Sequence, residues 1–262
     1  MEYIAVVLVT IIVSSLTFLS GFGLGTLLLP VFIAFFPIDI AIASTAIVHL
    51  ANNVFKAFLA GKKADINVLW KFSIPAALLA IIGAFLLNQL SGIPTLHSYQ
   101  IADHTFSIAP VKLLVAVIML IFSIIEFLPT TKNLAFDPKL IPIGGAISGF
   151  FGGLTGHQGA LRAAFLVRLG LDKETFIGTT ILSSIVIDVS RLVVYGATFF
   201  TKDFRTLLDQ GQAGVIVTGV IAAFIGAVLG YFFVKKVTLE FIHKVIGILL
   251  VFYSIALGAG LI

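Results

Sequence analysis

The stretch LTGHQGALR, from Leu154 to Arg162, interrupts a chain that is otherwise strongly apolar. A glycine-rich apolar run precedes it at residues 141–153, and the apolar segment AAFLV follows it. Polar and ionisable side chains inside apolar surroundings are costly unless they have partners or a function. The stretch therefore predicts a functional break between two buried helical segments.

The composition indicates a membrane protein. Of the 262 residues, 60% are hydrophobic and only 11% are charged, whereas soluble domains average about 25% charged residues. Several apolar windows exceed the roughly 20 residues that a helix needs to cross a bilayer. We therefore expect an all-α polytopic membrane protein, whose N-terminal sequence MEYIAVV is the first membrane segment and not a signal peptide.

Charge and cysteine content exclude several classes of function. The net charge is +4, but Lys and Arg are scattered over loops and helix ends, so no nucleic-acid partner is expected. The chain has no cysteine, which excludes disulfides, thiolate catalysis and Cys-bound metals. It also has no P-loop motif. We expect neither a cofactor nor a metal. Membrane lipids are the expected surrounding partner.

Apolar segments and their interruptions divide the chain. They predict helices at residues 4–20, 24–36, 39–60, 68–90, 109–128, 140–155, 158–170, 173–199, 212–234 and 239–261. Soluble stretches are expected at 61–67, 91–110 and 129–139. The last of these divides the chain into a first repeat at 1–128, a cytoplasmic linker at 129–139 and a second repeat at 140–262.

The two halves resemble each other after a shift of 135 positions. The shift places Leu19-Ser20-Gly21 on Leu154-Thr155-Gly156, Ser44-Thr45 on Thr179-Thr180, Asn53 on Asp188, Lys56 on Arg191 and Gly61 on Gly196. A glycine break, a hydroxyl pair and a cation rarely align together by chance. An internal duplication is therefore predicted.

The duplication leaves the relative orientation of the repeats to be decided. Segments 24–36 and 158–170 would span only about 20 Å, which is short of a bilayer core, so they are expected to be half-helices of re-entrant or discontinuous pairs. Three spanning helices would follow each pair. The distribution of Lys and Arg favours inverted repeats under the positive-inside rule. A parallel arrangement with eight spans stays open.

Inversion would bring the two glycine breaks together near the membrane midplane. The N-termini of two half-helices would then converge on one point, where unpaired N–H groups and helix dipoles favour an anion. The first break supplies the candidate binding residues Ser20, Gly21, Gly23 and Gly25, and the second supplies Thr155, Gly156, His157, Gln158, Gly159 and Arg162. Packing of small residues is the alternative explanation of the glycines.

Polar residues also recur at helical spacing on the two segments that follow. They are Thr45, His49, Asn52, Asn53 and Lys56 on one, and Thr179, Thr180, Ser183, Ser184, Asp188 and Arg191 on the other. Thr45, His49, Asn53 and Thr180 are candidate binding residues. Asp188 and Arg191 are spaced to form an ion pair, with either a structural or a functional role. Lys56 is expected to be an anchor near a loop.

These motifs resemble those of the sulfite exporter TauE/SafE family of membrane permeases. The resemblance rests on SGFGLGTLLLP at 20–30, on SGFFGGLTGHQGALRAAFLVRLGL at 148–171, and on the helix starts ASTA at 43–46 and GTTI at 178–181. It extends over almost the whole chain. The family's second break usually has a run of glycines ahead of a proline, whereas HQGALRAAF here has no proline, so the substrate stays open.

The resemblance implies a permease in the cell inner membrane for a small sulfur-containing anion, such as sulfite, thiosulfate or an organosulfonate like sulfoacetate. It implies alternating access driven by an ion gradient, with a proton or cation as coupling partner; Asp188, His49 and His157 are the titratable candidates. An uncoupled anion channel is the alternative. An intramembrane serine hydrolase using Ser20 and His157 is less favoured, because G-x-S-x-G is absent. Flux direction and a homodimer stay open.

Overall fold

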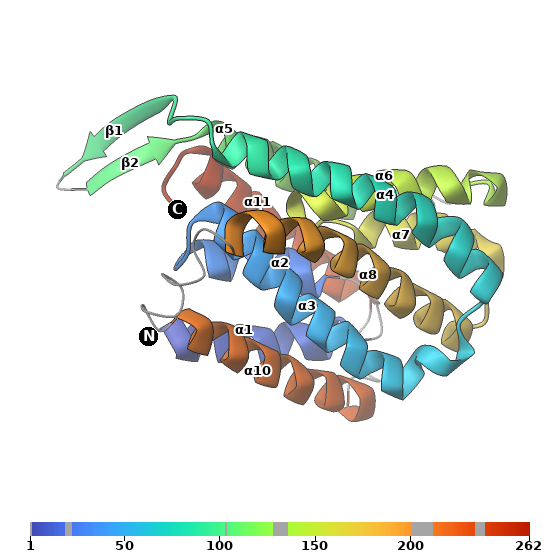
Figure 1. The fold of residues 1–262 in the computed structure, drawn as a ribbon. Helices are drawn as coiled ribbons and strands as arrows, with labels where there is room; N and C mark the ends of the chain where they lie inside the picture. Colours follow the sequence, from blue (N-terminus) through green and yellow to red (C-terminus); the bar gives the residue numbers. More distant parts are fainter. Residues whose placement is uncertain (1, 19–22, 103, 128–135, 201–211, 234–238) are drawn as a thin grey trace.

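The computed structural model describes residues 2–18, 23–102, 104–127, 136–200, 212–233 and 239–262, which form a helical bundle with a short hairpin at one end (Figure 1). The helices are α1 Glu2–Leu16, α2 Leu24–Ile33, α3 Ile38–Ala60, α4 Ile66–Ser91, α5 Pro110–Phe127, α6 Ile141–Thr155, α7 Gly159–Leu166, α8 Lys173–Tyr195, α10 Gln212–Phe233 and α11 Leu239–Gly258. Each corresponds to one predicted segment, although α1 ends at Leu16 and not near residue 20.

Within the described residues, four helices are long and apolar enough to cross a membrane: α3, α4, α8 and α10. Shorter apolar helices accompany them, among them α1, α2 and α5. The long helices carry many exposed apolar side chains, for example Phe85 on α4 and Val193 on α8. Such surfaces require lipid around them. The chain is therefore an integral membrane protein.

The stretch between α4 and α5 adds a short hairpin to a chain that is otherwise helical, as predicted. Residues predicted as a soluble loop form an antiparallel hairpin of β1 His97–Ile101 and β2 His104–Ile108, in which Tyr99 pairs with Phe106. Both strands alternate polar and apolar residues, which is the period of a strand. The Tyr99 hydroxyl donates to the carbonyl of Ala259 at 2.5 Å and ties the hairpin to the end of α11.

Glycines allow two pairs of helices to pack backbone against backbone. A Cβ placed on Gly149 or Gly153 of α6 would lie 2.0 Å from the carbonyl oxygen of Ala76 or Ala80 on α4. On α10, a Cβ at Gly230 would lie 2.5 Å from the Ser15 carbonyl oxygen of α1. Small residues at such spacing are the usual contact between membrane helices. The pairs α4–α6 and α1–α10 each run in the same direction.

By contrast, α3 and α8 pack against each other in opposite directions. The end of α3 lies beside the start of α8, where Lys63 and Glu174 form an ion pair and the Asp65 amide donates to Thr179 Oγ1 at 2.9 Å. The helices α5 and α11 are also antiparallel, as shown by the hydrogen bond from Ser123 Oγ to the Gly247 carbonyl at 2.8 Å. The start of α1, the hairpin and the end of α11 lie at one end of the bundle (Figure 1).

Candidate functional site

Each glycine break contains a residue in the left-handed region of backbone conformation. Gly23, which precedes α2, has φ 107°, and Gly156, which ends α6, has φ 83°. Glycine adopts this conformation without the steric cost that a Cβ imposes. The chain can therefore stop one helix and start the half-helix α2 or α7 in the interior of the bundle.

The two breaks meet inside the bundle beside α3. A Cβ placed on Gly25 would lie 3.7 Å from the Gly156 carbonyl oxygen and 3.5 Å from His49 Cδ2. The first turns of α2 and α7, which begin at Leu24 and Gly159, are thus brought close to one polar region. Two candidate residues of the first break, Ser20 and Gly21, lie outside the described residues. The predicted contact between Ser20 and His157 therefore also falls outside them.

Asp188 is the centre of this polar region. Its Oδ1 accepts hydrogen bonds from Arg191 Nη2 at 2.7 Å and from Gln158 Nε2 at 2.9 Å. Its Oδ2 lies 2.6 Å from His49 Nδ1. The carboxylate and the Arg191 guanidinium are both 0% exposed. A buried carboxylate needs this number of partners to offset its loss of hydration, and the partners come from α3, α7 and α8.

The contacts of His49 indicate its tautomer. Because Nδ1 faces the carboxylate of Asp188, it carries the proton and donates it. The amide nitrogen of Asn53 lies 3.1 Å from Nδ1 and 3.4 Å from Nε2. In the neutral ring with its proton on Nδ1, Nε2 is the acceptor.

Gln158 joins the second break to this network. Its side-chain oxygen accepts from Arg162 Nη1 at 3.2 Å, while its backbone carbonyl accepts from Ser148 Oγ at 2.8 Å. Arg162 is fully buried one turn into α7. Arg162, Gln158 and Asp188 therefore form a continuous chain of hydrogen bonds across the interior.

His157 lies in the break itself and is 2% exposed. Its Nδ1 lies 3.0 Å from Thr155 Oγ1, and its ring stacks on Phe122 of α5 with centroids 5.5 Å apart. Its Nε2 forms no hydrogen bond within the described part of the chain. A buried polar atom of this kind is expensive, and it is available to a ligand.

Thr45 and Thr180 are not brought into this centre. Thr45 precedes His49 by four residues on α3, and Thr180 precedes Asp188 by eight on α8. Because the two helices are antiparallel, the threonines lie on opposite sides of the His49–Asp188 contact, about 6 and 12 Å along the helix axes. Both are 2% exposed, and neither hydroxyl has a hydrogen-bond partner in the residues that the structure describes.

Lys56 corrects the prediction of a loop-proximal anchor. Its side chain is only 4% exposed, and its Nζ lies 5.4 Å from the centroid of the Phe18 ring. With its amide oriented to suit both neighbours, Asn52 donates to the Ala223 carbonyl at 3.2 Å and accepts from Lys56 Nζ at 3.1 Å. The sequence did place both residues on the polar face of α3, but a cation four residues from a helix end resembles a snorkelling residue.

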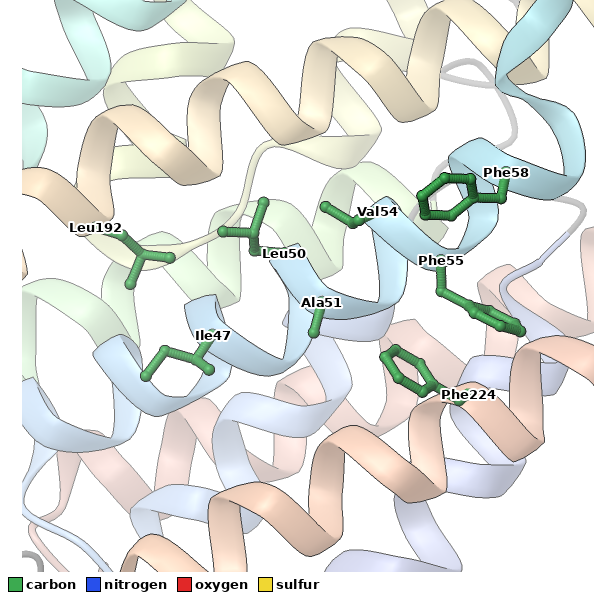
Figure 2. Close-up of a pocket in the computed structure, with 8 residues that line it drawn as sticks. All are labelled: Ile47, Leu50, Ala51, Val54, Phe55, Phe58, Leu192 and Phe224. Carbon is green, nitrogen blue, oxygen red and sulfur yellow. The ribbon is translucent and has the colours of Figure 1, made fainter.

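The opposite face of α3 borders a different kind of space. An apolar pocket of about 560 Å³ lies between α3, α8 and α10, and in Figure 2 the rings of Phe55 and Phe224 lie next to each other in its lining, stacked with centroids 4.8 Å apart. The other lining residues are Ile47, Leu50, Ala51, Val54, Phe58 and Leu192. Among the described residues no charged side chain lines it, so this pocket suits an apolar group and not an anion.

The family model described as "Sulfite exporter TauE/SafE" matches residues 6–257. The chain belongs to this family. Comparison with curated proteins and with solved structures finds no match. TauE/SafE proteins are membrane transporters of sulfur-containing anions. In this TauE/SafE protein, the buried network around Asp188 and the two glycine breaks are polar features of the interior.

Proposed function

We propose that the protein is a secondary transporter that moves a small sulfur-containing anion across the inner (cytoplasmic) membrane by alternating access. The candidate substrates are sulfite, thiosulfate and an organosulfonate such as sulfoacetate. The observation that carries the proposal is the meeting of the two glycine breaks: Gly25 of α2 adjoins Gly156 and His49 in the interior. The N-terminal turns of two short helices therefore lie close together, which supports an anion site between them.

The architecture proposed is that of two inverted repeats, 1–128 and 140–262, joined by the linker 129–139. Under inversion, equivalent helices run in opposite directions, and both α3–α8 and α5–α11 do so. The pairing is also reciprocal: the first helix of each repeat packs on the fourth helix of the other, as α1 on α10 and α6 on α4. These relationships support a twofold axis in the membrane plane, with α3 and α8 crossing near it.

The anion is held, in this proposal, by the N–H groups at the starts of α2 and α7, by an N–H on His157 Nε2 and by the charge of Arg162. The neutral His157 ring carries its proton on Nε2 when the Thr155 hydroxyl donates to Nδ1. A nearby carboxylate would repel an anion, but Asp188 already interacts with Arg191, Gln158 and His49. The positive ends of two helix dipoles then dominate the local field. Arg191 helps by holding the Gly152 carbonyl with Nη1 at 3.1 Å, which fixes the end of α6.

Coupling to protons is assigned to the His49–Asp188 contact, which joins the two repeats. A proton on His49 Nε2 would raise the charge of the His49–Asp188 pair from −1 to 0 and favour anion binding; its release would favour anion dissociation. Because α3 and α8 belong to different repeats, the His49–Asp188 contact also depends on the relative position of the two repeats. Thr45 and Thr180 would then line the two access paths, one toward each side of the membrane.

The test is a thermal-shift panel of the purified protein against sulfite, thiosulfate, sulfate, sulfoacetate, taurine and short carboxylates. A bound anion at 100 times its dissociation constant stabilises the protein by about 2.7 kcal/mol. His157→Ala and Arg162→Ala should lose this response. If both variants respond as the wild type does, the assigned site is wrong. In liposomes, saturable and gradient-dependent accumulation would support coupled transport, and uncoupled flux would indicate a channel.

A further inference from the structure

Lys56 is the feature of the interior that the proposed mechanism leaves unused. It lies in the span Ile38–Leu59 and is almost completely buried. Its contacts within the described chain are the Asn52 side chain and the Phe18 ring. No carboxylate pairs with it in the part of the chain that the structure describes. A buried ammonium without a counter-charge is unfavourable, so this side chain either gives up its proton or binds an anion.

The direction of the Lys56 side chain argues against a role as an anchor. A snorkelling lysine extends toward the nearer end of its helix, where water is available. The end of α3 at Ala60 is the nearer one, yet Nζ contacts Asn52, which lies one turn in the other direction, toward the interior. The charge is therefore placed inside the bundle, on the helix face that also carries Asn53 and His49.

The second half of the chain shows what is missing around Lys56. Under the shift of 135 positions, Lys56 corresponds to Arg191 and Asn53 to Asp188. Arg191 is neutralised by Asp188 at 2.7 Å, three residues before it. Asn53 is the neutral amide at the equivalent place, so the first half retains a cation and lacks its carboxylate. This asymmetry leaves the Lys56 amine, which lies 3.1 Å from the Asn52 amide oxygen and 5.4 Å from the centroid of the Phe18 ring, without a carboxylate in the described residues.

We propose that Lys56 supplies a second positive charge to the anion path and makes the transporter prefer divalent sulfur oxyanions over monovalent ones. The inference rests on the proposed function, because it assigns a residue and a charge class to the same path. Lys56 lies seven residues from His49 on α3, which is about 10 Å. At that range, loss of one unit charge should weaken binding by about tenfold for each negative charge on the ligand.

The experiment measures dissociation constants of thiosulfate, a divalent anion, and methanesulfonate, a monovalent one, by thermal-shift titration of the full-length protein. The variants are Lys56→Met, Lys56→Gln and Lys56→Arg. The control is Lys71→Met, which removes an exposed lysine of α4. We expect Lys56→Met and Lys56→Gln to weaken thiosulfate binding by about a hundredfold and methanesulfonate binding by about tenfold. Lys56→Arg should bind both anions as the wild type does, and Lys71→Met should change the affinity for neither.

Other results would overturn the proposal. If a folded Lys56→Met protein binds both anions with dissociation constants within about twofold of the wild-type values, the charge of Lys56 does not contribute to anion binding. Equal losses for both anions would indicate a structural effect. If neither uncharged variant folds while Lys56→Arg does, Lys56 is a structural cation. A wild type that binds neither these anions nor any other of the panel would instead remove the proposed function itself.

Discussion

His49 of α3 and Asp188 of α8 are in contact at 2.6 Å, although 139 positions separate them in the chain. The contact lies where two antiparallel helices cross, and it links the two halves of the protein. The carboxylate of Asp188 also accepts hydrogen bonds from Arg191 and Gln158. One buried acid is therefore shared by three donors, and its removal should affect stability and transport differently.

Replacing Asp188 alone should be more damaging than replacing Asp188 together with Arg191. Asp188→Asn leaves a fully buried guanidinium without its counter-charge, which typically costs about 3–5 kcal/mol. In the double variant Asp188→Asn/Arg191→Met, the uncompensated cation is absent, and much of the loss should be recovered. Free energies of unfolding in detergent micelles measure both effects. A double variant less stable than Asp188→Asn would mean that Arg191 stabilises the bundle independently of Asp188.

The close approach of α4 and α6 should not tolerate a methyl group. In Gly149→Ala the new Cβ would lie 2.0 Å from the Ala76 carbonyl oxygen, so the helices must separate. We expect a loss of stability of about 1–3 kcal/mol. Gly196→Ala is the matched control, because a Cβ there meets nothing within 4 Å, and its thermal unfolding temperature should stay the same or rise. Equal behaviour of the two variants would contradict the backbone contact.

Substitution of two neighbouring threonines on α8, Thr179 and Thr180, should have opposite effects on stability and on anion flux. Thr180 has no hydrogen-bond partner in the described residues, so Thr180→Val should leave the unfolding temperature unchanged or raise it while lowering anion flux. Thr179 Oγ1 donates to the Thr175 carbonyl at 2.7 Å and accepts from the Asp65 amide at 2.9 Å. Thr179→Val should therefore lower stability and keep flux per folded protein. Unchanged flux in Thr180→Val would remove this residue from the access path.

The cap of α8 predicts a pH dependence of stability. The Thr175 hydroxyl and the amides of Thr175 and Glu174 donate to Asp172 and hold the pKa of this exposed carboxyl below its ordinary value. A lowered pKa in the folded state stabilises the protein above the pKa of the unfolded chain, and this contribution disappears as the pH falls through the folded-state value. Asp172→Ala should therefore melt below the wild type at pH 7, with a difference that shrinks below about pH 4.

The control for this effect is Asp172→Asn. Asparagine is also a good N-cap residue but carries no charge. It should keep most of the stability at pH 7 without contributing to the pH dependence. If melting temperatures of the wild type and Asp172→Asn fall in parallel as the medium is acidified, the Asp172 carboxylate is not the group responsible.

The sequence predicted the helical segments well because apolar runs and glycine breaks are local signals. It also brought Asp188, Arg191, His49 and Gln158 forward as candidates, because polar and ionisable residues in membrane segments are rare. It could not predict which donors share the carboxylate of Asp188, since this depends on how α3, α7 and α8 cross. Thr45 and Thr180 stay candidate binding residues: both are buried, and the antiparallel course of α3 and α8 places them on opposite sides of the His49–Asp188 contact.

Two features that the sequence did not predict correctly have physical explanations. The strands at 97–101 and 104–108 were overlooked because a five-residue alternation is a weak signal beside long apolar helices. Lys56 was assigned to the membrane boundary because its distance from the end of α3 suggests snorkelling. The direction of a flexible side chain is set by its neighbours, here Asn52 on the same helix and Phe18 just beyond the end of α1.

The central claim is that the two glycine breaks hold the transported anion between them. Selenite, a heavier analogue of sulfite, allows a direct measurement through its anomalous X-ray scattering in crystals of the wild-type protein. The account predicts an anomalous peak between the first turns of α2 and α7, within hydrogen-bonding distance of His157 Nε2. Peaks confined to the bundle surface, at a selenite concentration that competes fully with sulfite transport, would contradict it.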